Sequence, residues 1–324
     1  MKKFHDGFYC LVTLGLLIVG PSVAASQAAE YPTKTVQIVN PFPPGAVTDI
    51  IARLVNDKIS AALGQPVVVV NKTGGGGAVG IKAVKDAPAD GYTILIAPPP
   101  IVLIPLARKG IGFDIGDFTP LNLIGRTPAV MIVKGDSPWK TMEDFIAEAK
   151  RKPGQLTFGT PGSGTSGHFT MELFKKETGI DLIHVPLGGE APVATGVLGG
   201  NIDTSIIGLG TARPHIEAGG LRALVTATQK RVKELPKVPT TFEKGLPTVE
   251  ASPWFVFFVR ANTSPAIVNK LAEVLSDAFA DKEIIAKIGK TGVSVENIGP
   301  EETKKYLAGE HKRWSEVAKI AKLN

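Results

Sequence analysis

Two loops in the sequence combine glycine with hydroxyl-bearing residues in a way that is typical of anion-binding sites. One spans residues 41–49 and the other residues 160–166, and each joins an expected strand to an expected helix. A helix N-terminus exposes backbone N–H groups that lack intrahelical acceptors, and it carries about half a positive charge. Glycines let this backbone approach a ligand closely, and Ser163, Thr165 and Ser166 add hydroxyl donors. Each loop is therefore a candidate site for a carboxylate or a phosphate.

Each loop could also be an ordinary capped turn. Thr48 or Asp49 would then cap the first helix, and Ser166 the second. Because two such loops occur on separate strand–helix halves of the chain, the pair favours a ligand held between two lobes.

Three glycine patterns suggest an enzyme instead. Residues 75–80 and 162–167 both fit G-x-G-x-x-G, the dinucleotide-binding pattern. Neither lies in the first strand–helix–strand unit, and neither has a clean acidic residue about 20 residues further on. Residues 164–168 resemble the nucleophile elbow of serine hydrolases, but His168 stands where that turn requires glycine. A secreted α/β enzyme, either a nicotinamide-dependent oxidoreductase or a hydrolase, remains the alternative to a binding protein.

The first 29 residues predict a secretory signal peptide. Lys2 and Lys3 precede an apolar stretch over residues 8–20, and small residues follow, so that a signal peptidase would cut after Ala24 or Ala28. The apolar stretch is too short to cross a bilayer as a helix. We therefore expect the chain to be exported.

The composition argues against several kinds of site. The only cysteine, Cys10, lies in the signal peptide, so the mature chain would have no disulfide, thiol nucleophile or cysteine zinc site. No two histidines have H-x-x-x-H spacing, and we expect no metal and no cofactor. Aromatic residues make up only 6% of the chain, which argues against stacking of single-stranded nucleic acid. A net charge of +6 without a dense basic run gives a weak bias toward anionic partners.

Strand and helix patterns alternate along the body of the chain. Strands are expected at residues 36–39, 66–70, 92–97, 129–133, 156–160, 182–185, 203–207, 223–228 and 254–259. Helices are expected at residues 49–63, 142–152, 168–177, 265–280 and 300–323, with a short one ending near residue 86. Four consecutive valines at 67–70 indicate a strand buried on both faces. The 324 residues predict two α/β lobes of about 150 residues each, with mostly parallel sheets flanked by helices.

Several of these motifs occur in an order that resembles the tripartite tricarboxylate transporter (TctC/Bug-type) solute-binding proteins. The resemblance covers essentially the whole mature chain. It rests on Tyr31-Pro32, PFPPG at residues 41–45, Thr48-Asp49, LGQPVVVVN at 63–71, DGYT at 90–93, residues 162–168, residues 185–192, GGNID at 199–203, Trp254 and residues 300–302.

This resemblance implies a two-lobe periplasmic-binding-protein fold, type II-like, with a ligand cleft between the lobes. Lobe 1 would comprise residues 30–130 and 252–324, and lobe 2 residues 131–251. The family implies capture of a small organic carboxylate, without catalysis, for a two-component membrane permease. We expect a dicarboxylate or an aromatic acid as ligand, a monomeric protein and no nucleic-acid partner. By position, the expected ligand-binding residues are Phe42, Pro43, Gly45, Ala46, Thr48, Asp49, Pro99, Thr160, Gly162, Ser163, Gly164, Thr165, Ser166, Gly189, Glu190 and Ala191.

Three positions bear on the choice of ligand. Ala46 stands where the family usually has a second glycine, so a slightly different backbone conformation is expected there. The stretch PPPIV at residues 98–102 replaces a polar segment and predicts a rigid, apolar wall. Such a wall favours a ligand with a hydrocarbon or aromatic body over a hydroxylated one such as citrate. Glu190 could meet an ammonium or a protonated acid, although an outward-facing loop glutamate is the favoured interpretation.

Overall fold

The computed structural model describes Met1 and residues 31–320. The expected signal peptide and its cleavage site therefore lie, apart from Met1, outside the described residues. Contacts divide the chain into residues 1–31 and residues 32–324, and the fold below is that of the second unit. Within the described part, no helix combines the length and apolarity needed to cross a membrane.

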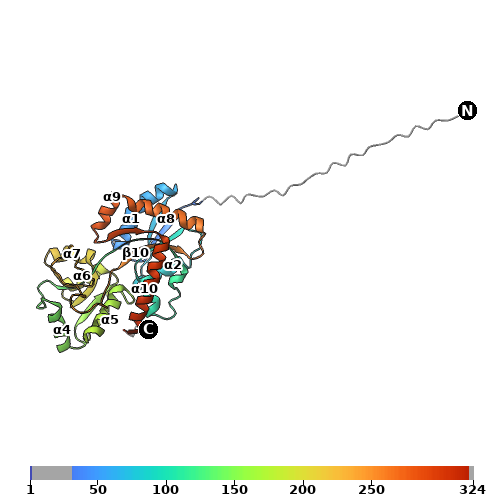
Figure 1. Cartoon of the computed structure of the whole chain (residues 1–324). Coiled ribbons are helices and arrows are strands. Elements are labelled where there is room, and N and C mark those ends of the chain that lie inside the picture. Colours follow the sequence, from blue (N-terminus) through green and yellow to red (C-terminus); the bar gives the residue numbers. More distant parts are fainter. Residues whose placement is uncertain (2–30, 321–324) are drawn as a thin grey trace. The chain divides into compact units, whose positions relative to one another are not determined.

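The first of two sheets contains strands from both ends of the chain (Figure 1). Its strand order is β11-β4-β10-β3-β1-β2. The strands are β1 (Val36–Asn40), β2 (Val67–Asn71), β3 (Thr93–Ala97), β4 (Phe118–Arg126), β10 (Trp254–Arg260) and β11 (Ser294–Ile298). The chain leaves this sheet after β4 and returns to it at β10.

The second sheet is formed by the middle of the chain. Its order is β7-β6-β8-β5-β9, and its strands are β5 (Ala129–Lys134), β6 (Thr157–Thr160), β7 (Ile183–Pro186), β8 (Thr204–Gly208) and β9 (Leu221–Thr226). The expected two-lobe α/β architecture is thus present, with one sheet in each lobe.

Both sheets are mixed, whereas the sequence predicted mostly parallel ones. β1 pairs in parallel with β2 and β3, but β10 runs antiparallel to both β3 and β4. In the second sheet, β5 runs antiparallel to β8 and β9. The parallel rule assumes that a helix connects each strand to its parallel neighbour. Instead, β4 leads directly to β5 in the other sheet, and β10 brings the chain back to the first sheet after a long connection, so these strands do not follow the rule.

The four valines of β2 do not form a strand buried on both faces. β2 is the edge strand of its sheet, and Val68 is 40% exposed. A continuous apolar run gives the β propensity of a strand but not its position in the sheet, which depends on the strands that come later in the chain.

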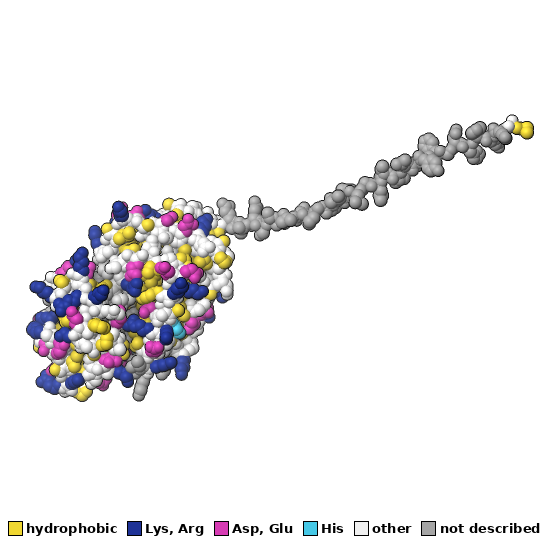
Figure 2. Space-filling view, viewed as in Figure 1, with side chains coloured by type: hydrophobic (Ala, Val, Ile, Leu, Met, Phe, Trp, Pro, Cys, Tyr) yellow, Lys and Arg dark blue, Asp and Glu magenta, His cyan; other side chains and the backbone are white. Residues whose placement is uncertain are grey.

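Helices cover both sheets. The first lobe has α1 (Val47–Leu63), α2 (Ala78–Lys85), α3 (Pro100–Ala107), α8 (Pro265–Ala280) and α9 (Lys282–Gly289), and the second has α4 (Met142–Arg151), α5 (Ser166–Thr178), α6 (Glu190–Leu198) and α7 (Leu209–Glu217). α1, α8 and α9 pack together over the first sheet (Figure 1). Basic and acidic side chains are interspersed on the face shown in Figure 2, as expected for a chain without a dense basic run.

The last helix, α10 (Pro300–Ile320), contacts the cores of both lobes. Leu307 belongs to the core beneath the first sheet, whereas Trp314 packs edge-on against Phe169 of α5, with 5.7 Å between ring centroids. The indole N–H groups of Trp254 and Trp314 both donate to one oxygen of Glu310, each at 3.0 Å. α10 therefore ties the returning strand β10 to the second lobe.

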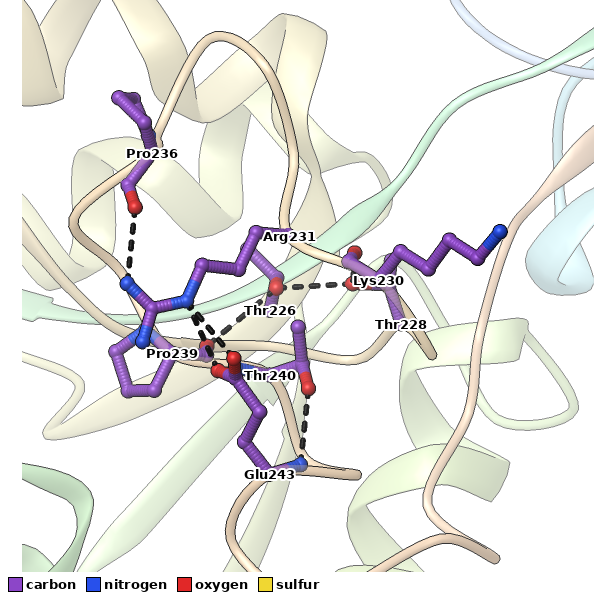
Figure 3. A network of polar contacts seen from close by, with 8 residues as sticks. All are labelled: Thr226, Thr228, Lys230, Arg231, Pro236, Pro239, Thr240 and Glu243. Atoms are coloured by element: carbon purple, nitrogen blue, oxygen red, sulfur yellow. Dashed lines mark hydrogen bonds and ion pairs between the residues drawn. The ribbon is translucent and has the colours of Figure 1, made fainter.

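The long connection from β9 to β10 lacks helices and strands and is ordered by polar contacts (Figure 3). Arg231 Nε donates to both carboxylate oxygens of Glu243, and its Nη1 donates to the carbonyl of Pro236 at 3.0 Å. Thr240 and Glu243 exchange reciprocal hydrogen bonds, each 3.0 Å long. These bonds fix the path by which the chain returns to the first lobe.

Candidate functional site

A cavity of about 560 Å³ lies between the two lobes. Its volume is within the range of small-molecule sites. From the first lobe it is lined by the loop before α1, by Pro98, Pro99 and Pro100, and by Phe255. The second lobe contributes the first turns of α5, α6 and α7 together with Ile206 and Ile207. The triple proline therefore does form an apolar wall of the cavity.

Both segments that connect the lobes also pass beside this cavity. Thr127 and Ala129 follow β4, and Ala251 and Pro253 precede β10; all four line the cavity. The two segments are joined by hydrogen bonds from Thr127 N to Pro253 O at 2.9 Å and from Ala129 N to Ala251 O at 3.2 Å. The two segments that connect the lobes thus form part of the cavity wall.

Most of the residues predicted from sequence line the cavity. Those that do are Phe42, Pro43, Gly45, Ala46, Thr48 and Pro99 from the first lobe, and Thr165, Ser166, Gly189, Glu190 and Ala191 from the second. Asp49, Thr160, Gly162, Ser163 and Gly164 are not among the lining residues, and each has another place in the structure.

Asp49 organises the first loop from behind. Its carboxylate is only 3% exposed and accepts hydrogen bonds from Gly45 N at 2.9 Å, Arg53 Nε at 3.0 Å and Asn71 Nδ2 at 2.8 Å. Burial raises the pKa of Asp49, but the bonds from Arg53, Gly45 and Asn71 outweigh it and hold this pKa below its usual value. Asp49 therefore stays ionised and fixes the turn that precedes α1.

The first half of the second loop packs against the first lobe instead of facing the cavity. A Cβ added to Gly162 would lie 3.0 Å from the Cα of Gly76, and one added to Gly164 would lie 2.9 Å from Ile104 Cγ1. Thr160 is fully buried, and its hydroxyl lies 2.6 Å from His184 Nε2. Glycine is required here because the two lobes approach each other backbone to backbone.

The hydroxyl of Thr165 is used inside the loop. It donates to the carbonyl of Gly162 at 2.7 Å and so closes the turn before α5. The expected donor toward a ligand at this end is therefore Ser166, the next residue, which also lines the cavity.

The helices that begin at the cavity lack the usual side-chain caps. Among the described helices, α1, α3, α5 and α6 begin without a hydrogen bond to their N-cap side chain. In contrast, α4, α8 and α9, whose first turns lie away from the cavity, are capped by Thr141, Ser264 and Asp281. The cavity thus collects helix N-termini without side-chain caps, and two of them, those of α1 and α6, carry an acidic residue in the first turn, Asp49 and Glu190.

In the described part of the chain, the first turns of α1 and α5 contain backbone amides without partners, as is usual at a helix N-terminus. The amides of Val47 and Thr48, and those of Ser166 and Gly167, find no acceptor within residues 31–320. The hydroxyls of Thr48 and Thr127 are buried without a hydrogen-bond partner in the same part of the chain. Since buried polar groups are nearly always paired, these groups make this part of the cavity the candidate position for an anionic or polar ligand.

The alanine that replaces a family glycine is accommodated without strain. Ala46 is the N-cap residue of α1, with φ −63° and ψ 155°, a conformation open to any residue. The neighbouring Gly45 has φ +82°, which does favour glycine.

Glu190 faces the cavity, contrary to the interpretation as an outward-facing loop residue. It is the first residue of α6, and its carboxylate accepts from Gly208 N at 3.0 Å and from Thr211 Oγ1 at 2.8 Å. These donors belong to the start of α7, so hydrogen bonds fix the carboxylate of Glu190 to the turn that begins that helix. The sequence could not show this because α6 and α7 were not predicted.

Two stacked histidines support the second loop. The rings of His168 and His184 lie 4.2 Å apart, and His168 Nδ1 accepts from Gly164 N at 3.3 Å. Burial, together with the neighbouring His184, lowers the pKa of His168 to about 4; burial and Lys175 lower the pKa of His184 to about 4. Both rings are therefore neutral near pH 7. Among the described residues, no hydrogen bond joins His168 to a serine, so the pairing of a serine nucleophile with its base is not present in this loop.

Several lining residues were not found from sequence. Thr127, Thr211 and Phe255 lie in segments without a glycine motif, and only the meeting of the lobes brings them to the cavity. The residues from 31 to 320 include no group of three or more His, Cys, Asp or Glu side chains that could hold a metal ion.

Two α/β lobes, joined by crossing strands and enclosing a cavity at uncapped helix N-termini, define a periplasmic-binding-protein fold. Comparison with known proteins gives the family. The model of the tripartite tricarboxylate transporter family receptor, TctC, matches residues 51–323. The chain therefore belongs to the TctC family, a family of solute-binding receptors.

Relatives with curated names or solved structures agree with this assignment. BugT of Bordetella pertussis is 31% identical over 313 residues, which cover 95% of this chain and 96% of BugT. The structure of Rpa4515 of R. palustris with adipate is 33% identical, with a TM-score of 0.83 over 90% of this chain and 98% of that one. MatC from Rhodopseudomonas palustris with bound malate is 26% identical, with a TM-score of 0.83 over 89% and 99% of the two chains.

Proposed function

We propose that this protein captures a small organic carboxylate in the cavity between its lobes and delivers it to a two-component membrane permease. The observation that carries the proposal is the convergence of uncapped helix N-termini and unpartnered buried hydroxyls on one cavity. A carboxylate supplies the acceptor oxygens that these donors lack.

In this proposal the first turns of α1 and α5 grip the carboxylate from opposite lobes. The free amides of Val47 and Thr48 act from one side and those of Ser166 and Gly167 from the other, with the hydroxyls of Thr48 and Ser166 beside them. Gly189 and Ala191 would line the same cleft. Asp49, Thr160 and residues 162–164 act indirectly, because they shape the loops rather than the cavity surface.

The proposed lobe boundaries follow the paths of the connecting strands. Lobe 1 would comprise residues 30–130 and 252–324, and lobe 2 residues 131–251. The division is supported by the sheets, since β4 and β10 lie in one and β5 and β9 in the other.

The body of the proposed ligand is apolar. Pro98, Pro99, Pro100 and Phe255 give the cavity hydrocarbon walls, which suit an aliphatic or aromatic acid better than a hydroxylated one. Adipate and malate, the acids named with the two related structures, support the carboxylate class. We further propose that the protein acts as a periplasmic monomer and performs no catalysis, as suits a solute-binding receptor.

The proposal is tested by a thermal-shift screen of the purified protein against mono-, di- and tricarboxylates and aromatic acids. Acids that raise the melting temperature are then titrated by calorimetry and recovered for proton NMR. A binding protein gains stability from its ligand by mass action and returns the acid unchanged. The absence of stabilisation by every acid, or conversion of a bound acid, would contradict the proposal.

A further inference from the structure

One of the lining residues, Glu190, carries a carboxylate, and this group affects which second functional group of a ligand the cavity accepts. Glu190 and Lys290 are the charged residues among the lining side chains, which all belong to the described part of the chain. Lys290 is exposed at the end of α9, so solvent screens its charge and its side chain is free to move. Glu190 is partly buried and held in place, so its charge acts on the cavity directly.

Glu190 is held by its own lobe in a fixed position. Gly208 N donates to one carboxylate oxygen and Thr211 Oγ1 to the other, at 3.0 and 2.8 Å. No lysine, arginine or histidine within residues 31–320 is within 4 Å of it as an ion-pair partner. Each oxygen keeps acceptor capacity after these bonds, because a carboxylate oxygen accepts more than one hydrogen bond.

Two donors at the start of α7, the amide of Gly208 and the hydroxyl of Thr211, are therefore already in use. The start of α7 is a helix N-terminus beside the cavity, and it would otherwise suit an anion. With Glu190 bonded there, this end of the cavity presents negative charge and acceptor oxygens. The first turns of α1 and α5 present only donors. The surface around Glu190 thus favours a donor group, whereas the first turns of α1 and α5 favour an acceptor.

We infer that Glu190 determines specificity by selecting a ligand whose second end is an ammonium or another hydrogen-bond donor, and by disfavouring a second carboxylate. This inference rests on the proposed function, because it assumes that the first carboxylate binds at α1 and α5. The substrate class is a monocarboxylate with an apolar aliphatic or aromatic body and a donor group at the far end.

Matched pairs of acids test the inference, since the members of a pair differ chiefly in the far group. The pairs are succinate with 4-aminobutyrate, glutarate with 5-aminopentanoate, adipate with 6-aminohexanoate, and terephthalate with 4-(aminomethyl)benzoate. Each is titrated by calorimetry into the parent protein. In the pair of best length, we expect the amino acid to bind at least about tenfold more tightly than the diacid.

The variant Glu190→Gln removes the charge and keeps the shape. Its amide oxygen can still accept from Gly208 N, so this bond to the start of α7 is kept and the fold is expected to be unchanged. The preference for the amino acid should fall by about tenfold or reverse. Glu283→Gln is the matched control, since Glu283 is an exposed glutamate of α9 outside the cavity and should leave the preference unchanged.

Two results would overturn the inference while leaving the proposed function intact. They are equal or tighter binding of the diacids by the parent, and a preference that is the same in the parent and in Glu190→Gln. Failure of every acid in both series to bind the parent would overturn the inference together with the proposed function. Melting curves without ligand separate any loss of folding from loss of preference.

Discussion

Replacing Thr48 by valine separates the cost of an unpartnered hydroxyl from its use in binding. Thr48 is 3% exposed, and its hydroxyl has no hydrogen-bond partner in the described chain. Leaving such a group unpaired costs about 1–3 kcal/mol, whereas valine fills the same space without it. Threonine and valine also have similar helix propensities. Thr48→Val should therefore raise the free energy of unfolding without ligand by about 1–2 kcal/mol.

Binding should change in the opposite direction. A hydrogen bond to a charged group contributes about 1.5–3 kcal/mol, so loss of the Thr48 hydroxyl should weaken carboxylate binding roughly 10- to 150-fold. Urea titration gives the stability, and calorimetry with the acid that stabilises the parent most gives the affinity.

The matched control is Thr170→Val. Thr170 lies in α5, is fully buried and also has an unpartnered hydroxyl in the described chain, but it does not line the cavity. It should gain stability and keep the parent affinity. Parent-like affinity in Thr48→Val would refute the placement of the carboxylate at α1, and a loss of stability would show that the hydroxyl is paired.

Two further predictions concern closure and pH. A Cβ on Gly210 would lie 1.6 Å from Thr291 O of the other lobe. Gly210→Ala should therefore push the lobes apart beside the cavity and lower the affinity at least about tenfold, whereas Gly289→Ala, where a Cβ meets open space, should leave the affinity unchanged. Equal calorimetric affinities for the two variants would contradict this. The two neutral histidines should contribute their full stabilisation above pH 6.5, and the free energy of unfolding should fall as the pH is lowered toward 4, because the unfolded chain takes up protons at a higher pH than the folded one. The expected loss is up to about 3 kcal/mol for His168 and less for the more exposed His184. Urea midpoints of the parent and His184→Phe across this range measure it, and parallel pH curves would speak against the histidines.

The sequence by itself identified the family, the two loops and most strands and helices. Helix α8 was predicted with its observed bounds, and α1 with its C-terminal end, because apolar spacing and the cap Gly64 are local signals. Parts of both loops line the cavity. Their conformations could be expected from the sequence because a glycine-rich turn before a helix determines its own backbone conformation. Local signals of this kind need no knowledge of the rest of the fold.

Tertiary structure alone decided which side chains face the cavity and which support it. Asp49 has the sequence context of a ligand-binding residue, yet Asn71 from β2 and Arg53 turn its carboxylate inward. Glu190 has the context of a solvent-exposed loop residue, yet the start of α7 draws it to the cavity wall. Thr127 carries no local signal, and it lines the cavity because two connecting segments run side by side there. Periodicity and caps depend on neighbours within a turn of chain, whereas these orientations depend on hydrogen-bond partners supplied by distant segments.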